Sequence, residues 1–95
     1  MKILHDEGGG VTELSKEFFY KYHPRIGRIY RIICSQDERT FNTEISGDEG
    51  VMLLSGFSVG YPGTGPRGLE EILKALGWIG TFREIASTDK FEWRR

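Results

Sequence analysis

Hydrophobic residues recur at helical spacing in one stretch of the second half of the chain. Pro66 suits the first position of a helix, where its missing N–H costs nothing, and Gly77 suits the left-handed residue that ends one. Glu70 and Lys74 are four residues apart, in the order that favours an ion pair on the outer face. The pattern therefore predicts a helix from about Pro66 to Gly77. Its buried face consists of residues at positions i, i+3, i+4 and i+7, namely Leu69, Ile72, Leu73 and Leu76.

A second helix is predicted nearer the N-terminus. Thr12 is a suitable N-cap, and the sequence His23-Pro24 ends the helix after Tyr22, because a residue before proline avoids the α region. One face of this helix collects hydrophobic side chains, which we expect to be buried: Val11, Leu14, Phe18 and Tyr22.

The remaining hydrophobic segments have the pattern of β-strands. Phe41, Thr43 and Ile45 alternate with polar residues, as in a half-buried strand, and Gly47-Asp48-Glu49-Gly50 has the composition of a hairpin turn. Strands are predicted over 2–5, 28–34, 41–45, 51–59, 78–85 and 91–93, with 51–59 as the central one. The order of elements predicts one α+β domain over residues 1–95, a mostly antiparallel sheet of four to five strands with two helices packed on it.

Composition and charge restrict the partners and the cellular location that we expect for the protein. The 95 residues carry a net charge of −1, which gives no general attraction to nucleic acid or to acidic membranes. No hydrophobic run approaches the length of about 20 residues that spans a bilayer, and residues 1–10 lack the hydrophobic core of a signal peptide. The single cysteine, Cys34, lies in a strand pattern and is expected to be a buried, reduced thiol. These features together favour a cytoplasmic protein without a membrane partner.

The glycine-rich loop that precedes the second-half helix is the strongest candidate for chemistry. Residues 63–68 match the pattern G-x-G-x-x-G between a predicted strand and a predicted helix. A complete dinucleotide domain is disfavoured, because too few residues follow the loop and the preceding strands are joined by hairpins. A P-loop is disfavoured as well, because Pro66-Arg67 stands where the lysine and the hydroxyl residue belong.

What remains is a general anion site. A helix N-terminus offers unpaired N–H groups and the positive end of a dipole, and glycines allow a ligand to approach the backbone. Arg67 could clamp an oxyanion, Tyr61 could stack on a base and Thr64 could donate a hydrogen bond. The loop residues proposed to contact a ligand are Gly60, Tyr61, Gly63, Thr64, Gly65, Arg67 and Gly68. The alternative is a tight turn in which Arg67 merely pairs with Glu70 or Glu71.

Basic residues elsewhere could contribute to the same pocket. Between residues 18 and 36 four cations and three tyrosines occur without any acidic residue, and Arg28 and Arg31 are the two that we place in the ligand site. Trp93, in the C-terminal tail, is added as an aromatic contact. The alternative is a solvated basic face beside the acidic stretch 37–50.

Catalytic patterns are absent from the sequence. His5 and His23 are isolated, without metal-ligand spacing to each other or to Cys34, and no nucleophile elbow surrounds Ser55 or Ser58. We therefore expect a binder without turnover, metal or cofactor, which sequesters or senses a phosphorylated small molecule, a nucleotide or a nucleotide-derived signal, as a homo-oligomer. The alternative is a protein-interaction module, such as an inhibitor or immunity-type protein. Nucleic-acid binding is the weakest option, because the cations are few.

Overall fold

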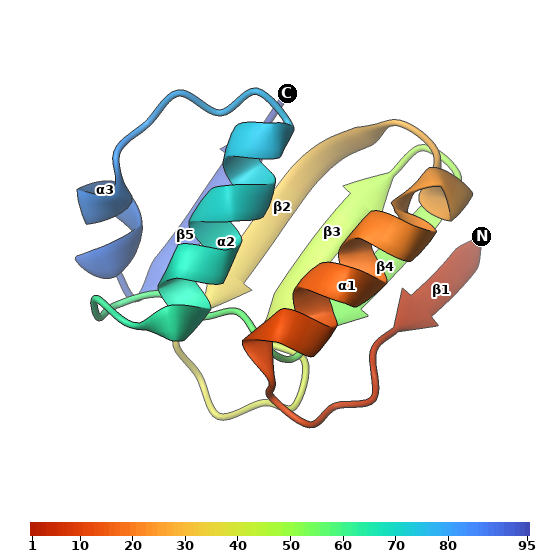
Figure 1. Cartoon of the computed structure of the whole chain (residues 1–95). Coiled ribbons are helices and arrows are strands. Elements are labelled where there is room, and N and C mark those ends of the chain that lie inside the picture. The colour runs from red at the N-terminus through yellow and green to blue at the C-terminus, as the bar shows by residue number, and fades with distance from the viewer.

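The computed structural model describes all residues from Met1 to Arg95. The chain contains five strands and three α-helices, and a short 3-10 helix, His23–Ile26, follows the first of these helices (Figure 1). The elements are β1 (Lys2–His5), α1 (Thr12–Tyr22), β2 (Ile29–Ser35), β3 (Thr43–Gly47), β4 (Gly50–Leu54), α2 (Thr64–Ala75), α3 (Phe82–Ala86) and β5 (Lys90–Arg94).

The strands form one mixed sheet in the order β1-β4-β3-β2-β5. β2, β3, β4 and β5 pair antiparallel, and the predicted hairpin is confirmed, since Gly47 pairs with Gly50 across the turn between β3 and β4. β1, the first strand of the chain, pairs with β4 in parallel at one edge of the sheet, with Leu4 opposite Met52. The predicted α+β class with a mostly antiparallel sheet is therefore confirmed, with one parallel pair and one α-helix more than expected.

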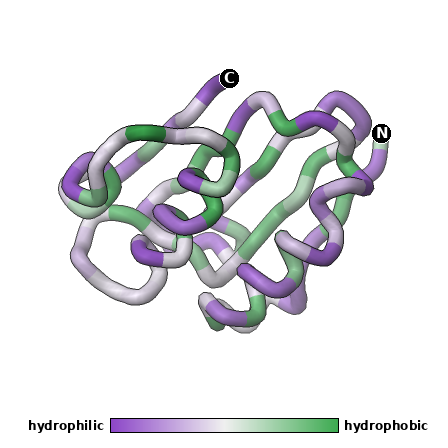
Figure 2. Tube along the Cα trace, turned by 45° about the horizontal axis from the view of Figure 1, so that its top comes forward, coloured by the Kyte–Doolittle hydropathy of each residue, from purple (hydrophilic) through white to green (hydrophobic).

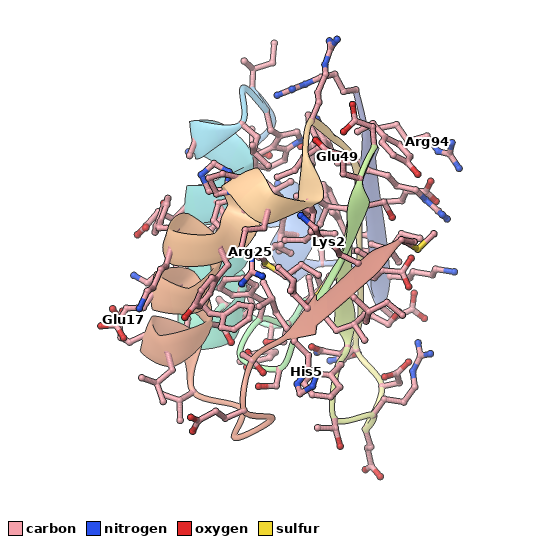
Figure 3. All side chains as sticks on the ribbon, turned by 90° about the vertical axis from the view of Figure 1, so that its right-hand side faces the viewer. Lys2, His5, Glu17, Arg25, Glu49 and Arg94 are labelled. Carbon is pink, nitrogen blue, oxygen red and sulfur yellow. The ribbon has the colours of Figure 1, made fainter.

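The helices cover one face of the sheet and leave the other face open (Figure 3). In Figure 2 the strands carry long hydrophobic stretches, whereas the helices alternate between hydrophobic and hydrophilic residues. The core lies between the two layers, with Ile32, Ile45 and Met52 from the sheet fully buried beneath Phe19 and Leu69 from the helices. No helix combines the length and the hydrophobicity needed to cross a membrane.

α2 follows its sequence pattern closely. Leu69, Ile72 and Leu73 are completely buried. The Glu70 carboxylate forms an ion pair with the Lys74 ammonium group at 3.0 Å. Gly77 ends the helix in the left-handed region, at φ +102°. The predicted start was two residues late, because the helix begins at Thr64 and Pro66 is its third residue. At that position proline also needs no hydrogen bond from its nitrogen.

α1 is rotated relative to the prediction. Its fully buried residues are Ser15 and Phe19, whereas Val11 and Leu14 are about half exposed, at 48% and 52%. Val11, and not Thr12, is the cap residue. This orientation of α1 results from hydrogen bonds that hold the Ser15 hydroxyl on the buried side of the helix. Phe19, one turn later on the same side, therefore lies in the core.

Two strand predictions were wrong. Residues 78–81 are irregular, and α3 then forms where a strand was expected, because the Glu84 carboxylate accepts the Thr81 N–H at 2.9 Å as in a capping box. β4 ends at Leu54 instead of Val59, since the next N–H, that of Ser55, turns to a carboxylate outside the sheet. β4 lies next to the edge strand, and the central strand is β3.

Candidate functional site

The N-termini of the two long helices come together at one end of the sheet (Figure 1). Gly68 permits this approach, because a Cβ at that position would lie 2.4 Å from the Thr12 methyl group and 2.9 Å from the Phe57 ring. The Thr12 hydroxyl donates to the Gly56 carbonyl at 2.7 Å, which fixes the start of α1 to the chain that leaves β4. The last glycine of the predicted motif is therefore a packing residue.

A buried carboxylate organises the same end of the sheet. Asp6, which is 6% exposed, follows β1 and accepts hydrogen bonds from the Ser15 hydroxyl, the Gly8 N–H and both the N–H and the hydroxyl of Ser55. Burial raises the pKa of Asp6, but the four hydrogen bonds outweigh it and hold that pKa below its ordinary value. Asp6 thus connects the carboxyl ends of the parallel strands β1 and β4 to α1.

A polar pocket of about 410 Å³ opens between these elements. Its floor comes from the start of α1, the segment after β4 and the start of α2, and its opposite wall comes from the loop between β2 and β3. The lining residues are Gly10, Thr12, Asp37, Glu38, Arg39, Asn42, Ser55, Gly56, Phe57, Ser58, Tyr61, Thr64 and Gly65. The pocket therefore lies beyond the carboxyl end of β4, at the end of the sheet where both long helices begin.

The helix ends in this pocket are not capped by side chains. Val11 and Gly63 occupy the two cap positions, and neither provides a side-chain hydrogen bond. The first intrahelical bonds are those from the Ser15 N–H to the Val11 carbonyl and from the Arg67 N–H to the Gly63 carbonyl, both at 3.1 Å. Earlier amides in each helix have no intrahelical acceptor, so both positive dipole ends are available to the pocket.

The opposite wall is charged, and one of its two carboxylates is paired with an arginine. The Arg39 guanidinium lies 2.8 Å from the Asp37 carboxylate, and both side chains remain substantially exposed. The hydrogen bond from Arg39 lowers the pKa of Asp37. Glu38 adds a second carboxylate to the lining. This wall offers hydrogen-bond acceptors across the pocket from the amide donors of the helix ends.

Three of the predicted ligand residues line this pocket. Thr64 and Gly65 are the first residues of α2, and Tyr61 stands beside them, 45% exposed, with its hydroxyl oxygen accepting from the Ser58 hydroxyl at 2.9 Å. Gly60 and Gly63 shape the backbone instead. Gly60 has φ +90° and donates its N–H to the Ile85 carbonyl at 3.0 Å. A Cβ on Gly63 would lie 2.2 Å from the Tyr61 ring.

The predicted cations and Trp93 lie elsewhere. Arg67 pairs with Glu70 at 3.1 Å, the alternative pairing considered from the sequence, and its guanidinium lies 3.5 Å from the centre of the Phe82 ring. Arg31 pairs with the Glu92 carboxylate at 3.1 Å. Arg28 directly precedes β2, and its N–H donates to the Asp48 carboxylate. Trp93 lies on β5 and packs, partly buried, against the core. The structure therefore does not bring Arg28, Arg31 or Trp93 to the glycine loop, and Arg67, although it belongs to that loop, does not line the pocket.

Sequence reasoning missed the residues that hold the pocket together. Asp6, Ser15 and Ser55 are far apart in the chain and follow no local motif. One signal was available, because Asp6 directly follows the segment 2–5, Ser55 directly follows the hydrophobic run 51–54, and each precedes a glycine within two residues. That signal becomes informative only once β1 and β4 are known to be parallel.

Comparisons with known proteins supply no further assignment, since no protein-family model, no curated protein and no solved structure matches the chain. Within the chain, no three His, Cys, Asp or Glu side chains come together as a metal ion would require.

Proposed function

We propose that this protein binds a phosphorylated small molecule, a nucleotide or nucleotide-derived signal, in the pocket between the N-termini of α1 and α2. The observation that carries the proposal is the convergence of two uncapped helix ends on one polar pocket. One such end is a common feature of any helical protein. Two ends that share a pocket of about 410 Å³ provide amide donors and positive potential from two directions.

The donors can be specified. In α2 the amides of Thr64 and Gly65 precede the first intrahelical bond, and Pro66 has no N–H to satisfy. In α1 the corresponding amides begin at Thr12. A phosphate group at this position would accept from backbone N–H groups, and the one arginine in the lining, Arg39, lies on the opposite wall paired with Asp37. The anion site therefore differs from the arginine clamp expected from the sequence.

The opposite wall favours a ligand with a second polar end. Asp37 and Glu38 would repel a bare phosphate, but they can accept hydrogen bonds from ribose hydroxyls or from the amino group of a base. The exposed Tyr61 ring offers a surface on which a base can stack. This distribution of donors and acceptors fits a nucleoside phosphate better than inorganic phosphate.

The carboxylates of the pocket fit binding better than turnover. Asp37 is the one that is paired with a cation, and its hydrogen bond from Arg39 lowers its pKa, which makes it a weak proton acceptor near neutral pH. We therefore propose that the protein sequesters or senses its ligand. The expected setting is the cytoplasm, where nucleotides are abundant.

The test is calorimetric titration with nucleoside mono- and diphosphates, with inorganic phosphate and the unphosphorylated nucleosides as comparison ligands. The Thr64→Glu variant places a carboxylate in the first turn of α2, where the helix dipole tolerates it but a phosphate cannot be accommodated beside it. We expect at least about tenfold weaker binding in this variant. Arg67→Ala is the matched control, since Arg67 faces Glu70 and Phe82, and we expect unchanged affinity. No response to any phosphorylated ligand would reject the proposal.

A second candidate function is binding of a protein at the open face of the sheet. A hollow of about 550 Å³ lies on that face, with Ile33, Phe41 and Leu53 as its hydrophobic lining. The acidic stretch 37–50 that suggested an inhibitor does not form one surface, because Asp37 precedes β3 and Asp48 follows it. Co-purification of a stoichiometric protein partner that is lost in Leu53→Lys would favour this candidate.

A further inference from the structure

The edge strand β1 has unused hydrogen-bonding groups. The N–H groups of Lys2 and Asp6 donate to the Glu49 and Leu53 carbonyls of the β4 side, at 3.3 and 3.2 Å. Because alternate residues of a strand point their backbone groups to opposite sides, those of Ile3 and His5 face away from the sheet. Figure 3 looks onto this edge, with Lys2 and His5 along the nearest strand.

Hydrophobic side chains are exposed on both faces of this edge. On the open face, Ile3 is 65% exposed. On the helical face, α1 presents the half-exposed Leu14 and the partly buried Phe18 and Tyr22 to a groove of about 270 Å³ beside the loop after β1. These are the residues whose spacing predicted burial. A further strand beside β1, with a helix above it, would cover both faces.

We propose that a second copy of this chain docks here, with the two β1 strands antiparallel across a two-fold axis. The free groups determine the register. If Ile3 of each protomer lies opposite His5 of the other, both form hydrogen-bonded pairs, and the two Leu4 residues meet at the axis. Leu4 points to the helical face and is only partly buried in one chain, so its contact with the second Leu4 would complete its burial.

Under this two-fold symmetry, the charges on the β1 edge of one copy meet opposite charges on the β1 edge of the other. β1 begins with the cation Lys2 and is followed by the acids Asp6 and Glu7. An antiparallel second copy places each Lys2 beside the acidic end of the other strand, and the two-fold axis forms this contact twice. A parallel second copy would instead set like charges beside each other, which is unfavourable.

The same axis brings the two α1 helices together. Ser15 of α1 is level with Asp6, to which it is hydrogen-bonded. The two residues from Asp6 back to Leu4 cover about 6.6 Å of strand, equal to roughly four residues of helix, so residues 18 and 19 are level with the axis. Two antiparallel α1 helices then place Phe18 against Phe18, and Glu17 of each beside Lys21 of the other. Both charged residues line the groove.

Sedimentation over a range of concentrations tests the proposal. We expect the mass to rise from the 10.9 kDa of one chain toward twice that value. Leu14→Lys should weaken the dimer about tenfold or more, because it places a charge in the groove. Ile79→Lys is the matched control, since Ile79 is 97% exposed and lies outside β1 and α1, and it should leave the mass unchanged. A mass of 10.9 kDa at every concentration up to the millimolar range would overturn the proposal.

Two further measurements identify the interface. Glu17→Lys should weaken the dimer, and the double variant Glu17→Lys with Lys21→Glu should restore it, because the exchanged charges again meet across the axis. Amide hydrogen exchange of Ile3 and His5 should slow as the protein concentration rises. A dimer in which these two amides keep the same exchange rate uses another surface, and that result would reject the β1 interface.

Discussion

Replacement of Asp6 by alanine is predicted to be the most damaging single change at the polar end of the sheet. The substitution removes the acceptor of four hydrogen bonds and leaves the buried Ser15 hydroxyl and the Ser55 N–H without their partner. Each buried donor that loses its acceptor costs about 1–3 kcal/mol, so the loss from these two is about 2–6 kcal/mol. A domain of this size has a total unfolding free energy of roughly 5–14 kcal/mol, so this is a large fraction.

Urea unfolding measures this effect. With an m-value of about 1–1.5 kcal/mol/M, a loss of about 4 kcal/mol, the middle of that range, should lower the urea midpoint of Asp6→Ala by roughly 3–4 M. Asp6→Asn should lose less stability: its unfolding free energy should fall by about 1–2 kcal/mol, because the amide oxygen keeps two of the donors satisfied. Glu7→Ala, at the exposed neighbouring acid, is the control and should stay within about 0.5 kcal/mol of the wild type.

The pH dependence provides an independent check. The pKa of Asp6 is below its unfolded value of about 3.9, so the carboxylate contributes its stability above that pH and loses it as the pH falls through the folded pKa. The difference in unfolding free energy between wild type and Asp6→Asn should therefore be constant from about pH 5 upward and shrink below about pH 4. Equal stability of Asp6→Ala and wild type at pH 7 would refute the role given to this network.

Three other predictions concern single sites. Gly68→Ala should lower the unfolding free energy by about 1–3 kcal/mol despite the better helix propensity of alanine. Adding Thr12→Ser to this variant should recover part of the loss, because it removes the clashing methyl group. Equal thermal midpoints of Gly68→Ala and wild type would contradict the close helix contact. Cys34 is buried with its pKa raised to about 11 by desolvation, so its reaction with a disulfide reagent at pH 8 should be more than about 100-fold slower than that of a free thiol, and a rapid reaction would show that the site opens. Glu84→Ala should destabilise the protein by about 0.5–1 kcal/mol in thermal unfolding, whereas Glu84→Gln should not, because glutamine can still accept the Thr81 N–H.

The parts of the fold that were predictable are those that local sequence determines. α2 has its hydrophobic face, its outer ion pair and its terminal glycine within 14 residues, from Thr64 to Gly77, and all three agree. The hairpin at Gly47–Gly50 is equally local. In these segments the periodicity, the turn residues and the final burial all depend on neighbours in the chain.

The parts that failed depend on distant partners. The orientation of α1 is determined by Ser15, a polar residue that hydrophobic periodicity treats as surface, because its acceptor Asp6 is nine residues away in another element. Residues 78–85 have strand-like composition, but the Thr81–Glu84 cap starts a helix there. The parallel return of β1 beside β4 has no local signal at all, although it positions both Asp6 and the pocket.

The candidate site was predicted in part. The glycine loop does lie at a helix N-terminus and Tyr61, Thr64 and Gly65 do line a pocket, as sequence context indicated. Arg67 was expected to face the ligand because a cation in the first turn of a helix is unfavourable. The structure shows a different compensation, since Arg67 pairs with Glu70 and lies over the Phe82 ring, and Phe82 belongs to the helix that the sequence did not predict.

The most direct test of the proposed anion site is a titration followed by backbone amide NMR signals, with a nucleoside monophosphate compared against the same nucleoside without phosphate. We predict large shifts of the Thr12, Thr64 and Gly65 amide signals that require the phosphate, while the Arg31 and Trp93 signals stay in place. Shifts that are the same with and without phosphate, or that avoid both helix ends, would contradict the central claim.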